Sequence, residues 1–345
     1  MISYLFTLYR KLKITKHWSY LKVLAFFISL MAYCVSGFMY FELNSNPDLS
    51  WSDSLWWTVV TMTTVGYGDY FPTTMWGRIL IGFPAMLLGV SILGYILSIL
   101  AAAIVEAKLK AIKGLNMIKE KGHIVVCRFF SLERMNRLIQ EVHKDKSTEF
   151  ASIVIIDPNL EQLPPEIDSD KVKFIKGDPT REATLNQANI TQAAACIIQA
   201  DHNDPAGTDN TSLKICLTME TMAPEVFSVA ECMDQENIAF LKKANCDSIV
   251  CISDLTGQMM VQELQDPGVG SVISELTSNT HGSQFYIIDI PQNAATYKDA
   301  VDRFAKQEIL TLGIRRKEDN ILMPPADLKL EKDDKIVLIA SRRPA

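Results

Sequence analysis

The stretch that decides the fold runs from residue 61 to residue 69 and reads Thr61-Met62-Thr63-Thr64-Val65-Gly66-Tyr67-Gly68-Asp69. Within it, two glycines flank a tyrosine. Glycine reaches backbone conformations that other residues avoid, so Gly66 and Gly68 allow successive carbonyl oxygens to lie on the same side of a loop. A turn that contains Gly-Tyr-Gly by chance is the alternative interpretation, and the flanking sequence decides between the two.

Two apolar runs, residues 23–41 and 79–105, lie on either side of this loop. At helical rise, the first has about the length of the hydrocarbon core of a bilayer. The second is longer, so it can tilt, bend or continue past the membrane. Two membrane spans are therefore predicted, and the segment between them must face outward or re-enter the membrane.

The charged residues around these runs predict the orientation. Basic side chains gather outside the two runs: Arg10, Lys11, Lys13, Lys16, Lys22, Lys108, Lys110 and Lys113. The segment between the runs is acidic, with Arg78 as its single basic residue. Because Lys and Arg collect on cytoplasmic flanks, we expect a multi-pass protein of the cell (inner or plasma) membrane with both termini in the cytoplasm.

The segment between the spans is expected to re-enter the membrane. Residues 54–63 are rich in tryptophan and valine and predict a short helix, with Ser52 or Asp53 as its cap. Non-helical backbone at membrane depth persists only where it is buried or lines water. The loop after the helix meets this condition only if further copies of the chain surround it. Four copies would place rings of carbonyl oxygens around one axis, where they can replace the hydration shell of a potassium ion. A homotetramer in a lipid membrane is therefore predicted.

Residues 20–105 resemble the pore of potassium channels, and the loop resembles their selectivity filter. The resemblance implies a filter made of Thr64, Val65, Gly66, Tyr67, Gly68 and Asp69. The carbonyl oxygens of the first four, with the Thr64 hydroxyl, would bind potassium, and Asp69 matches the acidic residue just outside the filter. One departure is Val60, which aligns with a carboxylate that family members often place behind the filter.

The second apolar run would be the gating helix, with Pro84, Gly89 and Gly94 as its candidate bending points. The hinge glycine of the family aligns with Leu88, so bending is expected to be distributed along the helix. Pro84 removes a helical hydrogen bond and should kink the helix near residue 80. The chain has no arginine-rich segment of the kind that senses voltage, so voltage is not expected to be the main trigger.

The rest of the chain has a different composition. The first 105 residues are apolar and aromatic, whereas the following 240 have the charged and apolar mixture of a globular domain. The net charge of −6 argues against a nucleic-acid partner. The seven cysteines form no Cys-x-x-Cys pair, so free thiols in a reducing compartment are expected rather than disulfides or a metal site.

Short β-rich runs alternate with amphipathic stretches from Gly122 onward. Strands are predicted at residues 123–127, 153–157, 172–176, 196–199, 226–230 and 248–252. This alternation is typical of βαβ units around a mostly parallel sheet. Helical segments at about 255–264 and 268–279 precede a smaller α+β unit. The predicted fold is multi-domain: an all-α two-span transmembrane pore module, then an α/β Rossmann-like domain with a small C-terminal α+β subdomain.

Residues 121–342 resemble an RCK domain, the ligand-binding module of many prokaryotic potassium channels. The motifs that carry this resemblance are Gly122-His123-Ile124-Val125-Val126-Cys127, Lys176-Gly177-Asp178-Pro179-Thr180, Asn245-Cys246-Asp247-Ser248 and Pro324-Pro325. The resemblance implies that RCK domains pair through the helices after the sheet and assemble into a cytoplasmic gating ring. A small regulatory ligand would reshape the ring, which would pull the inner helices through a linker.

These resemblances predict the domain boundaries. We expect a cytoplasmic N-terminal segment at 1–20, the pore module at 21–105, a linker at 106–121, the Rossmann-like N-subdomain at 122–253, connecting helices at 254–282 and the RCK C-subdomain at 283–345.

An adenine nucleotide (NAD, ADP or ATP) is one candidate ligand. A dinucleotide site needs glycines in the first strand-to-helix turn, where the pyrophosphate approaches the backbone. Those positions hold Arg128, Phe130 and Glu133, so the fingerprint is broken. Arg128 could still attract a phosphate in an altered pose. Asp157 ends the second strand where an acidic residue would bind a ribose hydroxyl, but an aspartate there is also an ordinary turn former.

Calcium is the rival ligand, because it binds clustered oxygen atoms. Glu231 matches an acidic position of calcium-responsive RCK domains, whereas its aligned companions, Gln199 and Met233, lack carboxylates. Asp234 is near Glu231 in sequence, and Asp178 lies in the third-strand motif. Both are candidate ligand-binding residues, although acidic loop residues are often merely solvated.

Two alternatives to a ligand-gated potassium channel stay open from the sequence. An RCK-containing membrane regulator of potassium transport would share the second half but has no reason to keep a complete filter. A membrane-anchored NAD-dependent oxidoreductase would need an intact glycine turn and acid–base residues. The five histidines are scattered, and no nucleophile pair is evident, so catalytic residues are not predicted.

Overall fold

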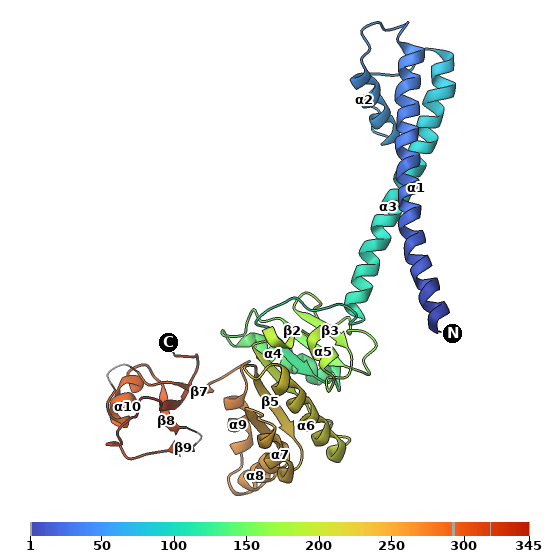
Figure 1. Cartoon of the computed structure of the whole chain (residues 1–345). Coiled ribbons are helices and arrows are strands. Elements are labelled where there is room, and N and C mark those ends of the chain that lie inside the picture. The colour runs from blue at the N-terminus through green and yellow to red at the C-terminus, as the bar shows by residue number, and fades with distance from the viewer. Residues whose placement is uncertain (1, 292–293, 318, 345) are drawn as a thin grey trace. The chain divides into compact units, whose positions relative to one another are not determined.

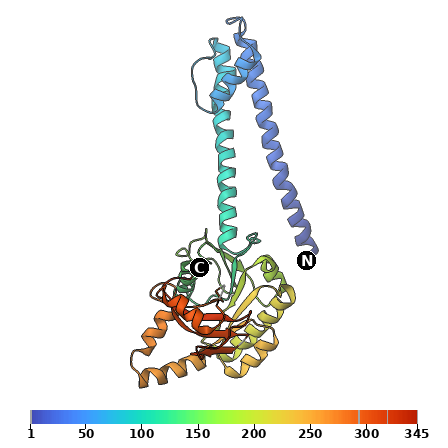
Figure 2. The same ribbon diagram turned by 90° about the vertical axis from the view of Figure 1, so that its left-hand side faces the viewer.

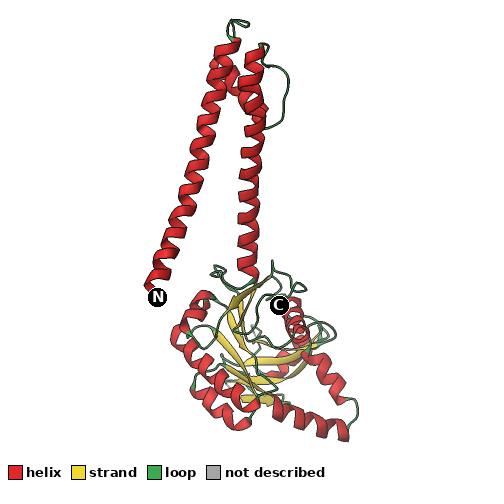
Figure 3. Cartoon of the chain, turned by 90° about the vertical axis from the view of Figure 1, so that its right-hand side faces the viewer, coloured by secondary structure: helices red, strands yellow, loops and turns green. Residues whose placement is uncertain are grey.

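The computed structural model describes residues 2–291, 294–317 and 319–344, and the side chains of these residues apart from those of 2–21 and 206. The chain divides into two compact units between Lys108 and Leu109. The first unit contains helices and loops, and all of the described strands belong to the second (Figure 3). The predicted fold class, a helical pore module followed by an α/β domain, is confirmed.

The first unit consists of two long helices with a short one between them (Figure 1). Its elements are α1 (Ile2–Glu42), α2 (Trp51–Met62), the π-helical segment η1 (Gly77–Gly82) and α3 (Phe83–Ile112), whose last four residues are counted with the second unit. By length and composition, the segments Lys22–Glu42 and Gly77–Ile112 are able to span a membrane. Helix α1 also includes residues predicted as a separate N-terminal segment.

Helix α2 begins earlier than the sequence predicts. Its N-cap is Ser50, not Ser52 or Asp53. The Ser50 side chain accepts a hydrogen bond from the backbone N–H of Asp53, and the Asp53 carboxylate accepts one from the backbone N–H of Ser50. This reciprocal capping box satisfies two amides that a helix start leaves free, so it outcompetes a cap one turn later.

The kink predicted at Pro84 takes the form of a local change in helix type. The π-helical segment η1 ends two residues before Pro84, so the wider turn lies directly ahead of the residue that cannot donate. The carbonyl oxygen of Leu80, four residues before Pro84, accepts a hydrogen bond of 2.9 Å from the Tyr33 hydroxyl of α1. The first span thus supplies the donor that Pro84 lacks.

The second unit begins with a six-stranded parallel sheet in the order β3-β2-β1-β4-β5-β6. The strands are β1 (Ile124–Cys127), β2 (Ile153–Asp157), β3 (Val172–Lys176), β4 (Ala195–Ile198), β5 (Phe227–Cys232) and β6 (Ser248–Cys251). The main connecting helices are α4 (Leu132–Lys144), α5 (Glu182–Gln187), α6 (Pro205–Met222) and α7 (Ile238–Lys243). Strands β1 and β2 are buried throughout, which explains their unbroken runs of Ile and Val. The chain order reverses between β1 and β4, and in such sheets ligands bind at this switch point.

A smaller subdomain ends the chain (orange to red in Figure 2). Helices α8 (Ile252–Gln265) and α9 (Val269–Thr277) lead to a four-stranded antiparallel sheet in the order β7-β10-β8-β9. Its elements are β7 (Gln284–Asp289), α10 (Tyr297–Ala305), β8 (Leu310–Arg316), β9 (Asp319–Leu322) and β10 (Lys335–Ala340). Ala300, Phe304 and Ile336 form part of its core.

The segment after α3 is fixed to the edge of the parallel sheet. The Gly114 carbonyl oxygen accepts a 3.0 Å bond from the Lys176 amide at the end of β3, and the Ile118 amide donates a 2.9 Å bond to the Gln187 carbonyl. Asn189 donates to the carbonyl of Glu120. The predicted linker is therefore hydrogen-bonded to the RCK-like fold over much of its length.

Candidate functional sites: the filter loop and the carboxyl edge of the sheet

The backbone of the filter loop alternates in handedness. Thr64, Gly66 and Gly68 have left-handed φ values of 64°, 59° and 79°, whereas Val65 and Tyr67 between them are not left-handed. In an ordinary extended strand, successive carbonyls point to opposite sides. Alternating left- and right-handed residues instead place successive carbonyl oxygens on one side, which is the geometry a ring of ion ligands needs. Thr64 adopts this conformation although it is β-branched, so the loop holds it in a strained state.

Several contacts hold the loop in this conformation. The Val60 carbonyl at the end of α2 accepts from the amides of Val65 at 3.0 Å and Gly66 at 3.3 Å. The Trp56 indole N–H donates a 2.8 Å bond to the Asp69 carboxylate, and its ring stacks on Tyr67 with centroids 5.9 Å apart. Trp56 thus supports the C-terminal end of the loop, and the Val60 carbonyl supports its N-terminal end.

Glu42 was not predicted from the sequence as a site residue, yet its carboxylate organises the loop that follows the filter. It is 3% exposed. One oxygen accepts from the amide and hydroxyl of Thr73, and the other accepts from the amide and hydroxyl of Thr74. The end of α1 is thereby tied to the start of the second span by four charge-assisted bonds. A membrane-edge glutamate followed by a Thr-Thr pair is the only sequence signal for this contact.

The candidate bending points of α3 have different surroundings. Gly89 is buried against the end of the pore helix, where a Cβ atom would lie 2.6 Å from Met62 Cγ and 2.8 Å from Met62 Cα. Around Gly94 no described atom would lie within 4 Å of such a Cβ. Gly89 is therefore a close-packing position beside the filter support, and Gly94 is the less restricted of the two.

At the carboxyl edge of the parallel sheet, Arg128 takes the place of the first glycine. Its φ of 78° is the left-handed value that a glycine would adopt there. The side chain is 8% exposed, and its guanidinium donates to the Thr208 hydroxyl at 2.8 Å, the Thr208 carbonyl at 3.3 Å and the Ser212 hydroxyl at 2.5 Å. Desolvation lowers the pKa of Arg128, although neighbouring acids oppose the shift. The arginine thus bridges β1 and α6 at the switch point.

Asp157 has a structural role in the present conformation. One carboxylate oxygen accepts from the Phe129 amide at 2.9 Å, and the other accepts from the amides of Asn159 and Leu160. These bonds join the turns after β1 and β2. A ribose hydroxyl would have to compete with three amides for this carboxylate, which supports the turn-former interpretation.

Glu231 is already occupied by cationic and amide groups. It forms an ion pair with Arg134 of α4 and accepts a hydrogen bond of 2.6 Å from the Ala200 amide. The His202 imidazole lies 2.9 Å from its other oxygen. Arg134 also lies over the Phe130 ring, with 5.6 Å to the centroid. Arg134 was not predicted, because in sequence it is an ordinary surface residue of an amphipathic helix.

The remaining candidates do not join Glu231 in one site. The Asp234 carboxylate caps the short helical turn that follows it. Asp178 accepts from the amide and hydroxyl of Thr180 within its own loop. Asp209 on α6 is 2% exposed, and its carboxylate accepts from the amides of Met233 and Asp234 after β5. Within the described part of the chain, no three His, Cys, Asp or Glu side chains are placed to hold a metal ion.

The carboxyl edge therefore carries two arginines and carboxylates that are engaged by donors. Arg134, Phe130 and His202 form one partly accessible cluster there, while the accessible carboxylates of Asp178 and Asp204 lie in the loops after β3 and before α6. Such a cluster suits an anionic ligand with an aromatic ring better than it suits a calcium ion, which needs free oxygen atoms.

Comparison with known proteins agrees with the division into two units. The family model for an ion channel matches residues 26–106, and the model for the calcium-activated potassium channel slowpoke-like RCK domain matches residues 119–230. The chain combines an ion-channel pore module with an RCK domain, and it is a membrane protein. The chain is homologous to prokaryotic potassium channels that have this architecture.

Relatives of similar length carry the same arrangement. A Bacillus subtilis protein named as a potassium channel, YugO, is 28% identical over 291 residues, which are 83% of this chain and 86% of the relative. The calcium-gated potassium channel TvoK of Thermoplasma volcanium is 26% identical over 302 residues, or 84% and 82% of the two chains. The solved GsuK channel bound to NAD has the same fold, with a TM-score of 0.50 and 18% identity over 94% of this chain. This chain spans 57% of the length of GsuK. The relatives are channels, and none of these comparisons points to an enzyme.

Proposed function

We propose that four copies of this chain form a potassium-selective pore whose opening is set by a ligand of the RCK domains. The single observation that carries the proposal is the alternation of left-handed residues at 64, 66 and 68. One copy exposes Val65 and Tyr67, which are 52% and 68% accessible. Backbone of this kind persists at membrane depth only when other copies surround it. Both termini would lie in the cytoplasm, as the distribution of basic residues indicates.

Pairing of RCK domains through α8 and α9 is supported by the apolar surface of these helices. Exposed apolar residues along them include Leu255, Met260, Val261, Leu264 and Val272. A shallow groove on this surface is lined by residues of both helices. Its apolar lining includes Met259, Met260 and Leu264. A patch of this kind on a globular domain indicates a protein contact, and a second copy of the same helix pair is the occupant that a gating ring requires.

The linker contacts support mechanical coupling. Because residues 114 and 118 are hydrogen-bonded to the ends of β3 and α5, a movement of the parallel sheet would carry the end of α3 with it. A linker fixed in this way would transmit most of a displacement of the sheet to the end of α3. A ligand gates the pore only to the extent that it prefers one state of the ring, and about 5.5 kcal/mol in total inverts a 1:99 equilibrium.

For the ligand of the carboxyl edge, we propose an adenine nucleotide rather than calcium. The support is the pair of arginines at the edge and the engagement of Glu231 by Arg134 and Ala200. The GsuK channel has been solved with NAD, whereas TvoK is named as calcium-gated, so relatives provide precedent for both classes. Calorimetric titration of the full-length protein with NAD, ADP, ATP and calcium decides between them. Calcium binding that is lost in Glu231→Gln, without any nucleotide binding, would reverse the choice.

Potassium flux into liposomes tests the channel itself. We expect flux that barium blocks and that excludes sodium. The absence of selective, barium-blocked flux under every ligand would favour the alternative of a non-conducting regulator of potassium transport.

A further inference from the structure

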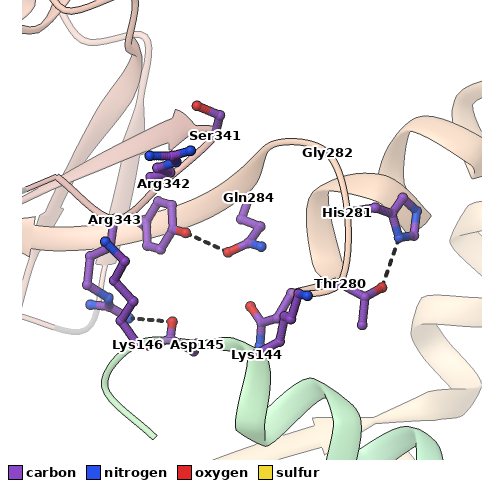
Figure 4. A pocket seen from close by; sticks show the side chains of 12 residues that line it. Lys144, Asp145, Lys146, Thr280, His281, Gly282, Gln284, Ser341, Arg342 and Arg343 are labelled. Carbon is purple, nitrogen blue, oxygen red and sulfur yellow. Dashed lines mark hydrogen bonds and ion pairs between the residues drawn. The ribbon is translucent and has the colours of Figure 1, made fainter. Parts of the chain in front are cut away.

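A cavity of about 280 Å³ opens in the second unit, and none of the ligand-site candidates at the carboxyl edge lines it. Figure 4 shows the side chains that do. It lies between the loop that follows α4 and the end of the chain after β10. The turn before β7 forms another part of its wall through residues 279–282. The cavity thus joins segments from the N-subdomain and the C-subdomain.

The lining of this cavity is basic, although the chain as a whole has a net charge of −6. Lys144 and Lys146 line it from the N-subdomain, and Arg342 and Arg343 line it from the C-subdomain. Asp145 is the only acidic residue of the lining. Desolvation raises the pKa of Asp145, but hydrogen bonds from Ser147 and the charge of Arg343 outweigh it and hold the pKa below its usual range. The carboxylate is therefore ionised at neutral pH, and the cations still outnumber it.

The cations of the cavity are poorly neutralised. Arg343 contacts Asp145 at 3.5 Å and lies over the Tyr286 ring at 5.1 Å from the centroid. An ion pair this long and partly exposed is weak, so it leaves most of the positive charge uncompensated. Among the described residues, Lys144, Lys146 and Arg342 have no ion-pair partner. These residues are exposed to solvent, and their like charges around one concave surface sum to a positive potential that would attract an anion.

We propose that this cavity binds a small molecule that carries a diphosphate group, and that the bound ligand links the two subdomains. Arginine recognises phosphate oxygens through paired N–H donors, and lysine adds point charges. Thr280, Asn279 and Ser341 line the same cavity with neutral hydrogen-bonding groups. Two adjacent phosphates carry enough charge to engage cations from both walls at once, whereas the cavity has too little apolar lining to recognise an acyl chain.

The consequence for regulation rests on the proposed gating function. Near the cavity, the Arg343–Asp145 pair joins the two subdomains, and Glu141 accepts a 2.8 Å bond from Ser278 in the segment that connects them. A diphosphate between Lys144 and Arg342 would add charge-assisted bonds across the same interface. The ligand would thereby restrict the movement of the C-subdomain against the parallel sheet.

Binding of inorganic pyrophosphate to the full-length protein tests the site. The titration is made at constant ionic strength, with sulfate as the competitor, on the wild type and on two double variants. Lys144→Glu/Arg342→Glu reverses one charge on each wall, and Lys171→Glu/Lys332→Glu reverses one exposed charge in each subdomain outside the cavity. We expect one site per chain, a loss of at least tenfold in affinity for the first variant and less than twofold for the second. Lys144→Gln/Arg342→Gln replaces the first variant if charge reversal disturbs assembly.

Equal losses in both variants, or equal competition by sulfate, would overturn the proposal, because they would indicate only non-specific attraction. ADP and adenosine distinguish the source of the diphosphate. Binding of ADP that depends on Lys144 and Arg342, with no binding of adenosine, assigns the group to a nucleotide, whereas binding of pyrophosphate alone assigns it to the inorganic ion. ADP binding that survives in the cavity variant but is lost in Arg128→Ala belongs to the carboxyl edge.

Flux measurements separate this proposal from the proposed function. Pyrophosphate is expected to change barium-blocked potassium flux at least twofold in the wild type and not in Lys144→Glu/Arg342→Glu. Specific binding without a change in flux would refute the regulatory link while the channel function stands. Absence of barium-blocked flux in every variant would refute the channel function and leave the binding result intact.

Discussion

The hydroxyl of Tyr33 in α1 donates a hydrogen bond of 2.9 Å to the carbonyl oxygen of Leu80, the oxygen that Pro84 leaves without its helical donor. An unsatisfied carbonyl away from water costs about 1–3 kcal/mol. We therefore expect Tyr33→Phe to lower the stability of the pore module by about 1 kcal/mol and to alter the open probability. Thermal unfolding in detergent and single-channel recording measure the two effects. Tyr40→Phe is the control, because Tyr40 is 77% exposed; equal effects of both variants would contradict the assigned role.

Trp56 is expected to maintain the selectivity of the filter. Trp56→Phe keeps an aromatic ring next to Tyr67 but removes the 2.8 Å bond to Asp69. A hydrogen bond to a charged group contributes about 1.5–3 kcal/mol, so the loop should leave its conducting conformation more often. We expect a several-fold loss of potassium-over-sodium permeability or a faster loss of current during recording. Trp51→Phe, at the exposed first residue of α2, should leave both properties unchanged.

Gly89 and Gly94 of α3 should respond differently to substitution by alanine. Gly89→Ala places a methyl group 2.6–2.8 Å from Met62, and overpacking of this kind costs about 1–3 kcal/mol. Gly94→Ala meets no described atom within 4 Å and improves helix propensity by up to about 1 kcal/mol. Size-exclusion chromatography during a heating series should show earlier loss of the assembled Gly89→Ala protein. The reverse order of stability would place Gly94, not Gly89, at the tight contact.

Gly114 is expected to couple the RCK domain to the gate. Its φ is 66°, and a Cβ atom there would lie 2.4 Å from the Lys176 amide nitrogen, so an alanine has no room beside β3. Gly122 has a similar φ of 65° but no described atom within 4 Å of its added Cβ. Gly114→Ala should reduce the ligand-induced change in flux by more than half and leave barium-blocked flux itself in place. Gly122→Ala introduces the same left-handed backbone strain but no contact with β3, so it is the control. A comparable loss of the ligand response in Gly122→Ala would exclude the contact with Lys176 as the cause.

His123 should make the stability of the second unit sensitive to acid. It is fully buried, its Nε2–H donates to the Ala188 carbonyl at 2.9 Å, and its Nδ1 has no described partner. Desolvation lowers its pKa from the ordinary 6.5. The unfolded chain therefore binds a proton at higher pH than the folded chain, so this contribution is fully present above about pH 6.5 and is lost as the pH falls below it. Denaturant unfolding at pH 7.5 and pH 5.5 should show a smaller difference in His123→Gln than in the wild type. The same substitution at the exposed His281 is the control.

Much of this fold is readable from the residues because the periodicities are local. The apolar runs on both sides of residue 61 and the β-rich runs after Gly122 are each sufficient to define an element, and the structure contains them. The predicted start of α2 was wrong. A cap by a single residue, Ser52 or Asp53, was predicted, whereas Ser50 and Asp53 cap the helix as a pair. A reciprocal cap depends on two side chains at once, and Ser52 offered a plausible local competitor.

The ligand side of the molecule was less predictable, because its side chains meet across large sequence separations. Arg134 reaches Glu231 from another element, and nothing in the sequence around either residue indicates the pair. The left-handed Arg128 was identified as a lost glycine, but its bonds to Thr208 and Ser212 arise only when α6 packs beside β1. The cavity between the N-subdomain and the C-subdomain is likewise lined by residues 144 and 342, which no sequence motif connects.

The position of Arg128 has a consequence for the concentration range of regulation. Its guanidinium is held by Thr208 and Ser212, so a phosphate that draws it into the switch point would have to replace these bonds. Replacing bonds worth a net 1–3 kcal/mol would raise a dissociation constant by roughly one to two orders of magnitude. A site weakened in this way does not respond to trace messengers. The adenine nucleotide proposed for this site would then be sensed as an abundant metabolite, and potassium permeability would follow the energy status of the cell.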